Sequence, residues 1–138
     1  MALSFAVNYI GVLVAALVSF MFGWMWFGPV FGKIWMKAMK ISPREAEEMS
    51  KNGVLVPIFL GFILALIGSY VIAVLIASLG IVTVKGALLL GLIIWLGFFF
   101  TTHFGNNMWE NKHLNIFYLY IGQDLCRILI ICLILVLM

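Results

Sequence analysis

Residues 54–79 read VLVPIFLGFILALIGSYVIAVLIASL, an apolar run without a single charged side chain. About 20 apolar residues let a helix cross the ~30 Å hydrocarbon core of a bilayer, and this run is longer. Pro57 falls in the first turn of the expected helix, where its missing N–H breaks no hydrogen bond. The stretch therefore predicts a transmembrane helix.

Three more apolar runs of similar length accompany it, so four spans are expected, at about 5–28, 54–79, 81–105 and 114–138. Of the 138 residues, 66% are apolar and 9% are charged. Soluble domains carry about 25% charged residues, so a water-soluble fold is excluded. We predict an all-α fold, a polytopic transmembrane four-helix bundle formed by one domain over residues 1–138, with the lipid bilayer as its main partner. Gly80 alone separates spans two and three, which predicts a tight helical hairpin.

The connector at residues 29–53 holds most of the charged side chains. Basic residues recur in it at helical spacing: Lys33, Lys37, Lys40 and Arg44. This basic amphipathic pattern predicts a helix in the lipid headgroup layer, either as an anchored connector or as a docking site. A second short helix is expected from Ser42, with Pro43 at its first position, an internal Glu47–Lys51 pair, and Asn52-Gly53 at its end.

Lysine and arginine also predict the orientation. They concentrate in the first connector, with Lys112 in the third, whereas the second has only Lys85 and the N-terminus has none. The positive-inside rule then places the connector at 29–53 in the cytoplasm and both termini outside the cell membrane. Most of the net charge of +3 comes from that connector, so no nucleic acid is expected as a partner.

Small residues recur every fourth position in the first two spans. The two stripes are Gly11, Ala15, Ser19 and Gly23, and Gly61, Ala65, Ser69, Ala73 and Ala77. Small residues let helix backbones approach closely within a bilayer. The stripes predict a close crossing between these spans or between copies of the chain, and we expect a homo-oligomer.

The fourth span contains a candidate intramembrane polar site. Asp124 and Arg127 stand three residues apart near its middle, where each charge costs about 2.5–3.5 kcal/mol to insert. Tyr120 adds a hydroxyl to the same stripe, and Gln123 precedes the carboxylate. An ion pair at this depth is either a functional site or a clamp that fixes the helices.

A second candidate is an inner-face polar cluster at the end of the third span. His103, Asn107 and Glu110 share one face if the helix continues past Phe104. One histidine and one glutamate are too few for zinc, so capping and interface hydrogen bonds are the simpler interpretation. Counted from the ends of the spans, Asp124 is expected to lie too deep in the membrane to join this cluster. A proton relay from His103 toward Asp124 is a further interpretation.

The beginning of the chain resembles a known family. Asn8-Tyr9 opens the first span, and its end contains Trp26, Gly28-Pro29, Gly32-Lys33 and Trp35. Together with Trp109-Glu110-Asn111-Lys112, this pattern resembles the DUF1761 family of small, mostly bacterial membrane proteins. Phe27 stands where that family usually has tyrosine. The resemblance implies four transmembrane helices and no established biochemical activity.

Three functions remain open on these grounds. We expect passage or sensing of a small solute or ion at the intramembrane polar site, with the species unknown. The alternative is an accessory or scaffold membrane subunit whose polar residues clamp helices. A metal-dependent membrane enzyme ranks third, because the sequence has no phosphate loop, paired-cysteine or HExxH motif. No cofactor, metal ligand set or catalytic residue is predicted.

Overall fold

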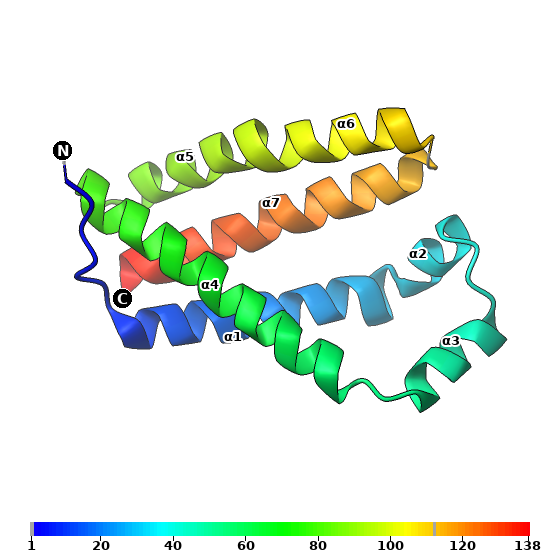
Figure 1. The fold of residues 1–138 in the computed structure, drawn as a ribbon. Helices are drawn as coiled ribbons and strands as arrows, with labels where there is room; N and C mark the ends of the chain where they lie inside the picture. The colour runs from blue at the N-terminus through cyan, green and yellow to red at the C-terminus, as the bar shows by residue number, and fades with distance from the viewer. Residues whose placement is uncertain (1, 112) are drawn as a thin grey trace.

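The computed structural model describes residues 2–111 and 113–138, and this part of the chain is helical without strands (Figure 1). Its elements, in order, are α1 (Tyr9–Met25), the π-helical turn η1 (Trp26–Val30), α2 (Gly32–Ala38), α3 (Pro43–Lys51), α4 (Leu55–Leu79), α5 (Val84–Ile94), the π-helical turn η2 (Trp95–Phe100), α6 (Thr101–Glu110) and α7 (Leu114–Leu137).

Four continuous helical segments are long and apolar enough to cross a membrane: Tyr9–Val30, Leu55–Leu79, Val84–Glu110 and Leu114–Leu137. The first begins later than the apolar run because Asn8 caps it, its Oδ1 accepting from Gly11 N at 3.1 Å. The third begins after Thr83, whose Oγ1 accepts from Gly86 N at 3.1 Å, and it continues to Glu110. The third helix thus reaches five residues further than the run from which it was predicted.

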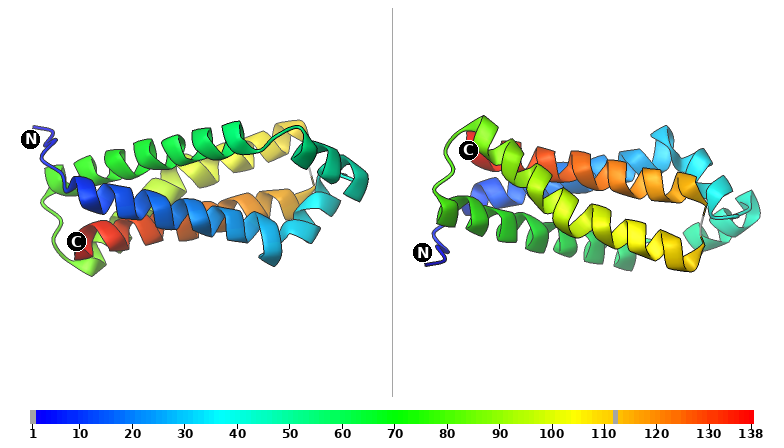
Figure 2. Two further views of the ribbon diagram at one scale, coloured as in Figure 1. Left: turned by 90° about the horizontal axis from the view of Figure 1, so that it is seen from below. Right: turned by 90° about the horizontal axis from the view of Figure 1, so that it is seen from above.

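The long helices pack in an open arrangement (Figures 1 and 2). Helix α1 packs against both α4 and α7, and α5 packs against α7. The tight hairpin predicted for spans two and three is wrong. A loop at residues 80–83 turns through left-handed Gly80 (φ 66°), and α4 and α5 then diverge because each packs on a different partner.

The two small-residue stripes explain the partner of α4. Ala15 and Ser19 on α1, and Ala65 and Ser69 on α4, are all buried, and these two helices have the most extensive contact in the molecule. The close crossing between the first two spans is therefore present within one chain. The ends of the α1 stripe face α7 instead, since an added Cβ at Gly11 would lie 3.6 Å from Met138 Cβ and one at Gly23 would lie 3.1 Å from Gln123 Nε2.

The connector differs from its prediction in one respect. Helix α2 ends at Ala38 and Lys40 adopts a left-handed conformation (φ 59°), so Lys40 and Arg44 do not extend the basic face of Lys33 and Lys37. A residue in that conformation ends a helix, and Arg44 belongs to the next one.

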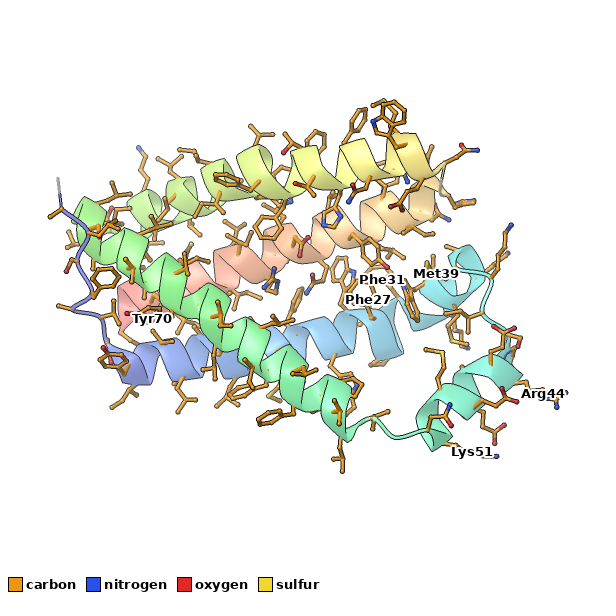
Figure 3. All side chains as sticks on the ribbon, in the orientation of Figure 1. Phe27, Phe31, Met39, Arg44, Lys51 and Tyr70 are labelled. Atoms are coloured by element: carbon orange, nitrogen blue, oxygen red, sulfur yellow. The ribbon has the colours of Figure 1, made fainter. Side chains whose placement is uncertain are left out.

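Helix α3 forms as predicted. Ser42 Oγ accepts from Glu45 N at 3.1 Å, Lys51 Nζ lies 3.8 Å from Glu47 Oε1, and Gly53 closes the segment at φ 98°. Arg44 and Lys51 point away from the long helices (Figure 3).

Both chain ends lie at one end of the molecule, and α2, α3 and the α6–α7 turn lie at the other (Figure 1). At the first end, Asn8 Nδ2 donates to Met138 O at 3.3 Å. Lys112, which the orientation argument used, lies outside the described residues.

Candidate intramembrane polar site

Asp124 is the centre of the polar site. It lies halfway along α7, about 15 Å from the helix start at 1.5 Å per residue, and is 9% exposed. Arg127 Nη2 donates to its Oδ1 at 3.2 Å, one helical turn away. The Arg127 guanidinium also lies over the ring of Phe99 in η2, 5.8 Å from its centroid. The ion pair therefore faces the third span.

His103 on α6 completes the site. Its Nε2 lies 2.7 Å from Asp124 Oδ2, and since an ionised carboxylate only accepts, this imidazole nitrogen donates to it. The expectation that Asp124 lies too deep for this contact is wrong. Helices α6 and α7 are antiparallel neighbours. His103 lies seven positions, about 10 Å, before the end of α6, and Asp124 lies ten positions, about 15 Å, after the start of α7, so the two side chains come within reach of each other. The sequence estimate ended the third span too early and so placed His103 at the surface.

Tyr120 and Gln123 lie on different sides of this centre. The Tyr120 ring packs beside His103, with centroids 5.6 Å apart, and its hydroxyl accepts from Trp35 Nε1 at 3.3 Å. Gln123 instead faces α1, where a side chain at Gly23 would come within 3.1 Å of its Nε2. The four residues singled out on α7 thus form a polar band around the helix.

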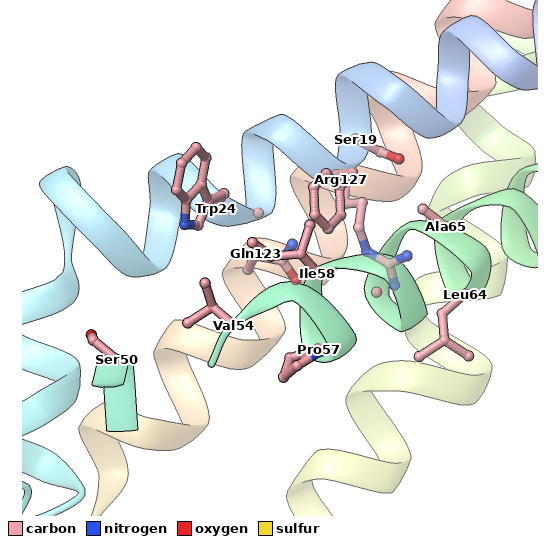
Figure 4. A pocket seen from close by; sticks show the side chains of 13 residues that line it. Ser19, Trp24, Ser50, Val54, Pro57, Ile58, Leu64, Ala65, Gln123 and Arg127 are labelled. Carbon is pink, nitrogen blue, oxygen red and sulfur yellow. The ribbon is translucent and has the colours of Figure 1, made fainter. Parts of the chain in front are cut away.

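Two cavities flank the polar band. On the His103 side, a cavity of about 180 Å³ is lined by polar residues of α6 and by mostly apolar residues from the first turns of α7: His103, Asn106, Asn107, Glu110, Ile116, Phe117 and Tyr120. It unites the three residues of the predicted inner-face cluster. On the Arg127 side, a cavity of about 640 Å³ lies between α1, α4 and α7 (Figure 4). Its wall is apolar except for Ser19, Ser50, Gln123 and Arg127.

Tryptophans hold this part of α7 in place, a role that the sequence analysis missed. Trp26 Nε1 donates to Leu119 O at 3.1 Å, and Trp95 Nε1 donates to Ile121 O at 2.8 Å. Each of these tryptophans begins a π-helical turn, and their acceptors flank Tyr120. The shared Trp-x-Gly sequence at 26–28 and 95–97 is the signal that could have indicated related positions.

Aromatic and glycine residues at the end of the first span set the path of the backbone beside the hydrogen bond from Trp26 to Leu119. Pro29 has no N–H, and Phe31 N donates to Trp26 O at 2.9 Å, which makes a π-helical turn. Gly32 then lets the chain fold back, because a Cβ there would lie 2.9 Å from Phe27 O. Phe27 and Phe31 lie on the side of η1 that faces α7 (Figure 3), and the Phe27 ring packs 5.6 Å from that of Tyr120.

The remaining residues of the N-terminal motif have simpler positions. Asn8 caps α1, Tyr9 stacks on Tyr70 with centroids 6.5 Å apart, and Lys33 is exposed on α2. A side chain at Gly28 would meet nothing within 4 Å. These residues shape and cap the first span and line neither cavity.

The site offers two groups to a metal ion, the imidazole of His103 and the carboxylate of Asp124. Among the described residues, no three His, Cys, Asp or Glu side chains lie close enough together to hold one. Protein zinc sites use three or four such ligands.

Four apolar helices of spanning length, with an Asp–Arg–His centre between the third and the fourth, are compatible with a small multi-pass membrane protein. Its sequence matches the model for the family described as "Protein of unknown function (DUF1761)" over residues 10–136, nearly the whole chain. The chain belongs to this family, as the motif around Trp26 and Trp35 indicates. Comparisons with curated proteins and with solved structures give no match.

Proposed function

We propose that this protein passes or senses a small solute or ion at the polar site around Asp124. One observation supports the proposal: Asp124 binds His103 on one side and Arg127 on the other, and each of these partners lines a different cavity. The carboxylate thus stands between a polar chamber beside α6 and a wider chamber between α1 and α4. Charged residues inside spans commonly mark such pathways.

His103 links the polar site to a second helix. Asp124 and Arg127 both belong to α7, so their pair joins no two helices, whereas the contact with His103 joins the fourth span to the third. Histidine and carboxylate side chains inside spans commonly form proton relays, and such a pair between the two cavities favours passage.

Proteoliposome flux tests the proposal. The wild-type protein and the Asp124→Asn/Arg127→Gln variant are compared across protons and common ions, with His103→Gln as a variant that leaves the ion pair intact. We expect flux from the wild type and its loss in both variants. If the wild type moves nothing and the double variant is equally stable, passage is refuted.

An accessory or scaffold role is the second candidate. The contact between His103 and Asp124 joins the third span to the fourth, as a clamp does. A stable double variant that keeps every partner of the wild type would favour this role.

The proposal places the four long helices in the membrane as a transmembrane bundle. Helix α2 lies at the headgroup layer, with Lys33 and Lys37 toward lipid phosphates. The connector lies in the cytoplasm and both termini lie outside. Self-association belongs to the proposal too, through lipid-facing surfaces other than the buried stripes of α1 and α4.

A further inference from the structure

We infer that the cavity between α1, α4 and α7 binds an amphipathic organic acid, with its anionic head at Gln123 and Arg127 and its apolar tail along α4. The inference deepens the proposed function by naming a ligand class for the wider cavity. Whether the bound acid is then passed or sensed rests on the proposed function, whereas its binding does not.

The first support is the polar end of the cavity. Gln123 is only 8% exposed, it lines the cavity, and its side-chain amide has no hydrogen-bond partner among the described residues. Its amide atoms are not covered by protein and open into the cavity, so within an otherwise buried side chain they point to a ligand that accepts from them. Its Nε2 supplies two N–H donors.

The second support is the neighbouring guanidinium. Arg127 lines the same cavity one turn along α7, and within the described chain its hydrogen bond to Asp124 uses one of five N–H donors. Figure 4 shows Gln123 and Arg127 extending from α7 into the space between α1 and α4. An amide and a guanidinium side by side suit a carboxylate, which accepts hydrogen bonds at both oxygens.

The third support is the size and chemistry of the remaining wall. A volume of about 640 Å³ falls within the range of about 300–1,000 Å³ that holds small organic ligands, and it far exceeds what a bare ion needs. Phe20, Ile58 and Leu64 give it an apolar lining. A molecule with one anionic end and a short hydrocarbon chain matches both parts.

Access comes from the bilayer. Trp24, Ile58 and Leu64 are exposed at the rim, on helix surfaces that face lipid in a spanning protein. The cavity extends from Ser50 and Val54 at the connector end to the level of Arg127 (Figure 4). An acid dissolved in the leaflet can therefore enter between α1 and α4 without crossing water.

Calorimetric titration of the protein in nanodiscs tests the inference, with empty nanodiscs to subtract partitioning. Octanoate is the probe, 1-octanol is the neutral analogue with the same chain, and acetate is the head without the tail. We expect saturable octanoate binding, at least about tenfold weaker 1-octanol binding, and no measurable acetate binding.

Two pairs of variants locate the site. Gln123→Leu removes the amide donors and Gln123→Glu places a like charge at the head, and both should weaken octanoate by about tenfold or more. Leu64→Phe narrows the cavity and should weaken binding, whereas Ile67→Phe, exposed on the same helix outside the cavity, should not. The Leu64 and Ile67 pair keeps the test valid if a Gln123 variant does not fold.

Three results would overturn the inference: equal affinity for octanoate and 1-octanol, octanoate binding unchanged by both Gln123→Leu and Leu64→Phe, or a bound phospholipid that octanoate cannot displace. Because binding is measured without a gradient, it is independent of flux. Octanoate binding without any flux refutes passage and keeps the ligand class, whereas ion flux without octanoate binding refutes the ligand class alone.

Discussion

The ion pair in α7 should show unequal effects when its two partners are removed in turn. Asp124→Asn leaves the Arg127 guanidinium without a carboxylate in a side chain that is 23% exposed. Breaking a buried pair from one side costs about 3–5 kcal/mol, and an unpaired arginine at a helix centre costs about 2.5–3.5 kcal/mol to insert. We expect a loss of about 3 kcal/mol, which is roughly a hundredfold change in the unfolding equilibrium.

Arg127→Gln should cost less, because Asp124 keeps the hydrogen bond to His103 at 2.7 Å. We expect about 1.5–2 kcal/mol, the lower part of the range for one lost charge-assisted hydrogen bond. The double variant Asp124→Asn/Arg127→Gln contains no unpaired charge at this position and should recover to within about 1 kcal/mol of the wild type.

The assay is reversible unfolding by sodium dodecyl sulfate in mixed micelles, followed by circular dichroism. Glu47→Gln supplies the matched control, since Glu47 and Lys51 form an exposed pair on α3 with a separation of 3.8 Å. Its cost should be about 0.3–0.5 kcal/mol. If the losses of the two single variants simply add in the double variant, Asp124 and Arg127 are not coupled and the reasoning fails.

Three shorter predictions concern the fold and its orientation. Ala15→Leu should destabilise the protein by about 1–3 kcal/mol, because Ala15 is completely buried. Gly68→Leu is the control and should be tolerated, because an added Cβ there meets nothing within 4 Å. Equal losses of unfolding free energy in the two variants would contradict the α1–α4 crossing. Trp95→Phe should cost about 0.6–1.7 kcal/mol through the lost bond to Ile121 O, and no loss would show that this bond does not hold α7. Ser50→Cys should resist an impermeant thiol reagent added to intact cells and react after permeabilisation, and labelling of intact cells would reverse the orientation.

The helices were largely predictable from sequence because their causes are local. Run length identified four spans, and the Ser42 cap and the Glu47–Lys51 pair located α3. The small-residue stripes also indicated the α1–α4 crossing, because close approach in a bilayer depends on residue size.

The site was predictable only in part, because it depends on the relative positions of two helices. The spacing of Asp124 and Arg127 was enough to pair them. The contact of Asp124 with His103 depends on how far the third helix continues past Phe104. Hydropathy underestimated that length, because residues 101–110 continue the helix although many of them are polar. The wide cavity lies between α1, α4 and α7, so it depends on how three helices pack against one another, which no local sequence pattern indicated.

The π-helical turn at Trp95–Phe100 sets the rotational phase of everything that follows it in the third span. One residue corresponds to about 100° around an α-helix, so a one-residue deletion that converted this turn to regular α-helix would rotate α6 by roughly that angle relative to α5. His103 would then turn away from Asp124 even though every residue of the site is still present. In this span the length of the chain matters as much as its composition, and relatives that gain or lose one residue between Trp95 and His103 should lack the histidine contact.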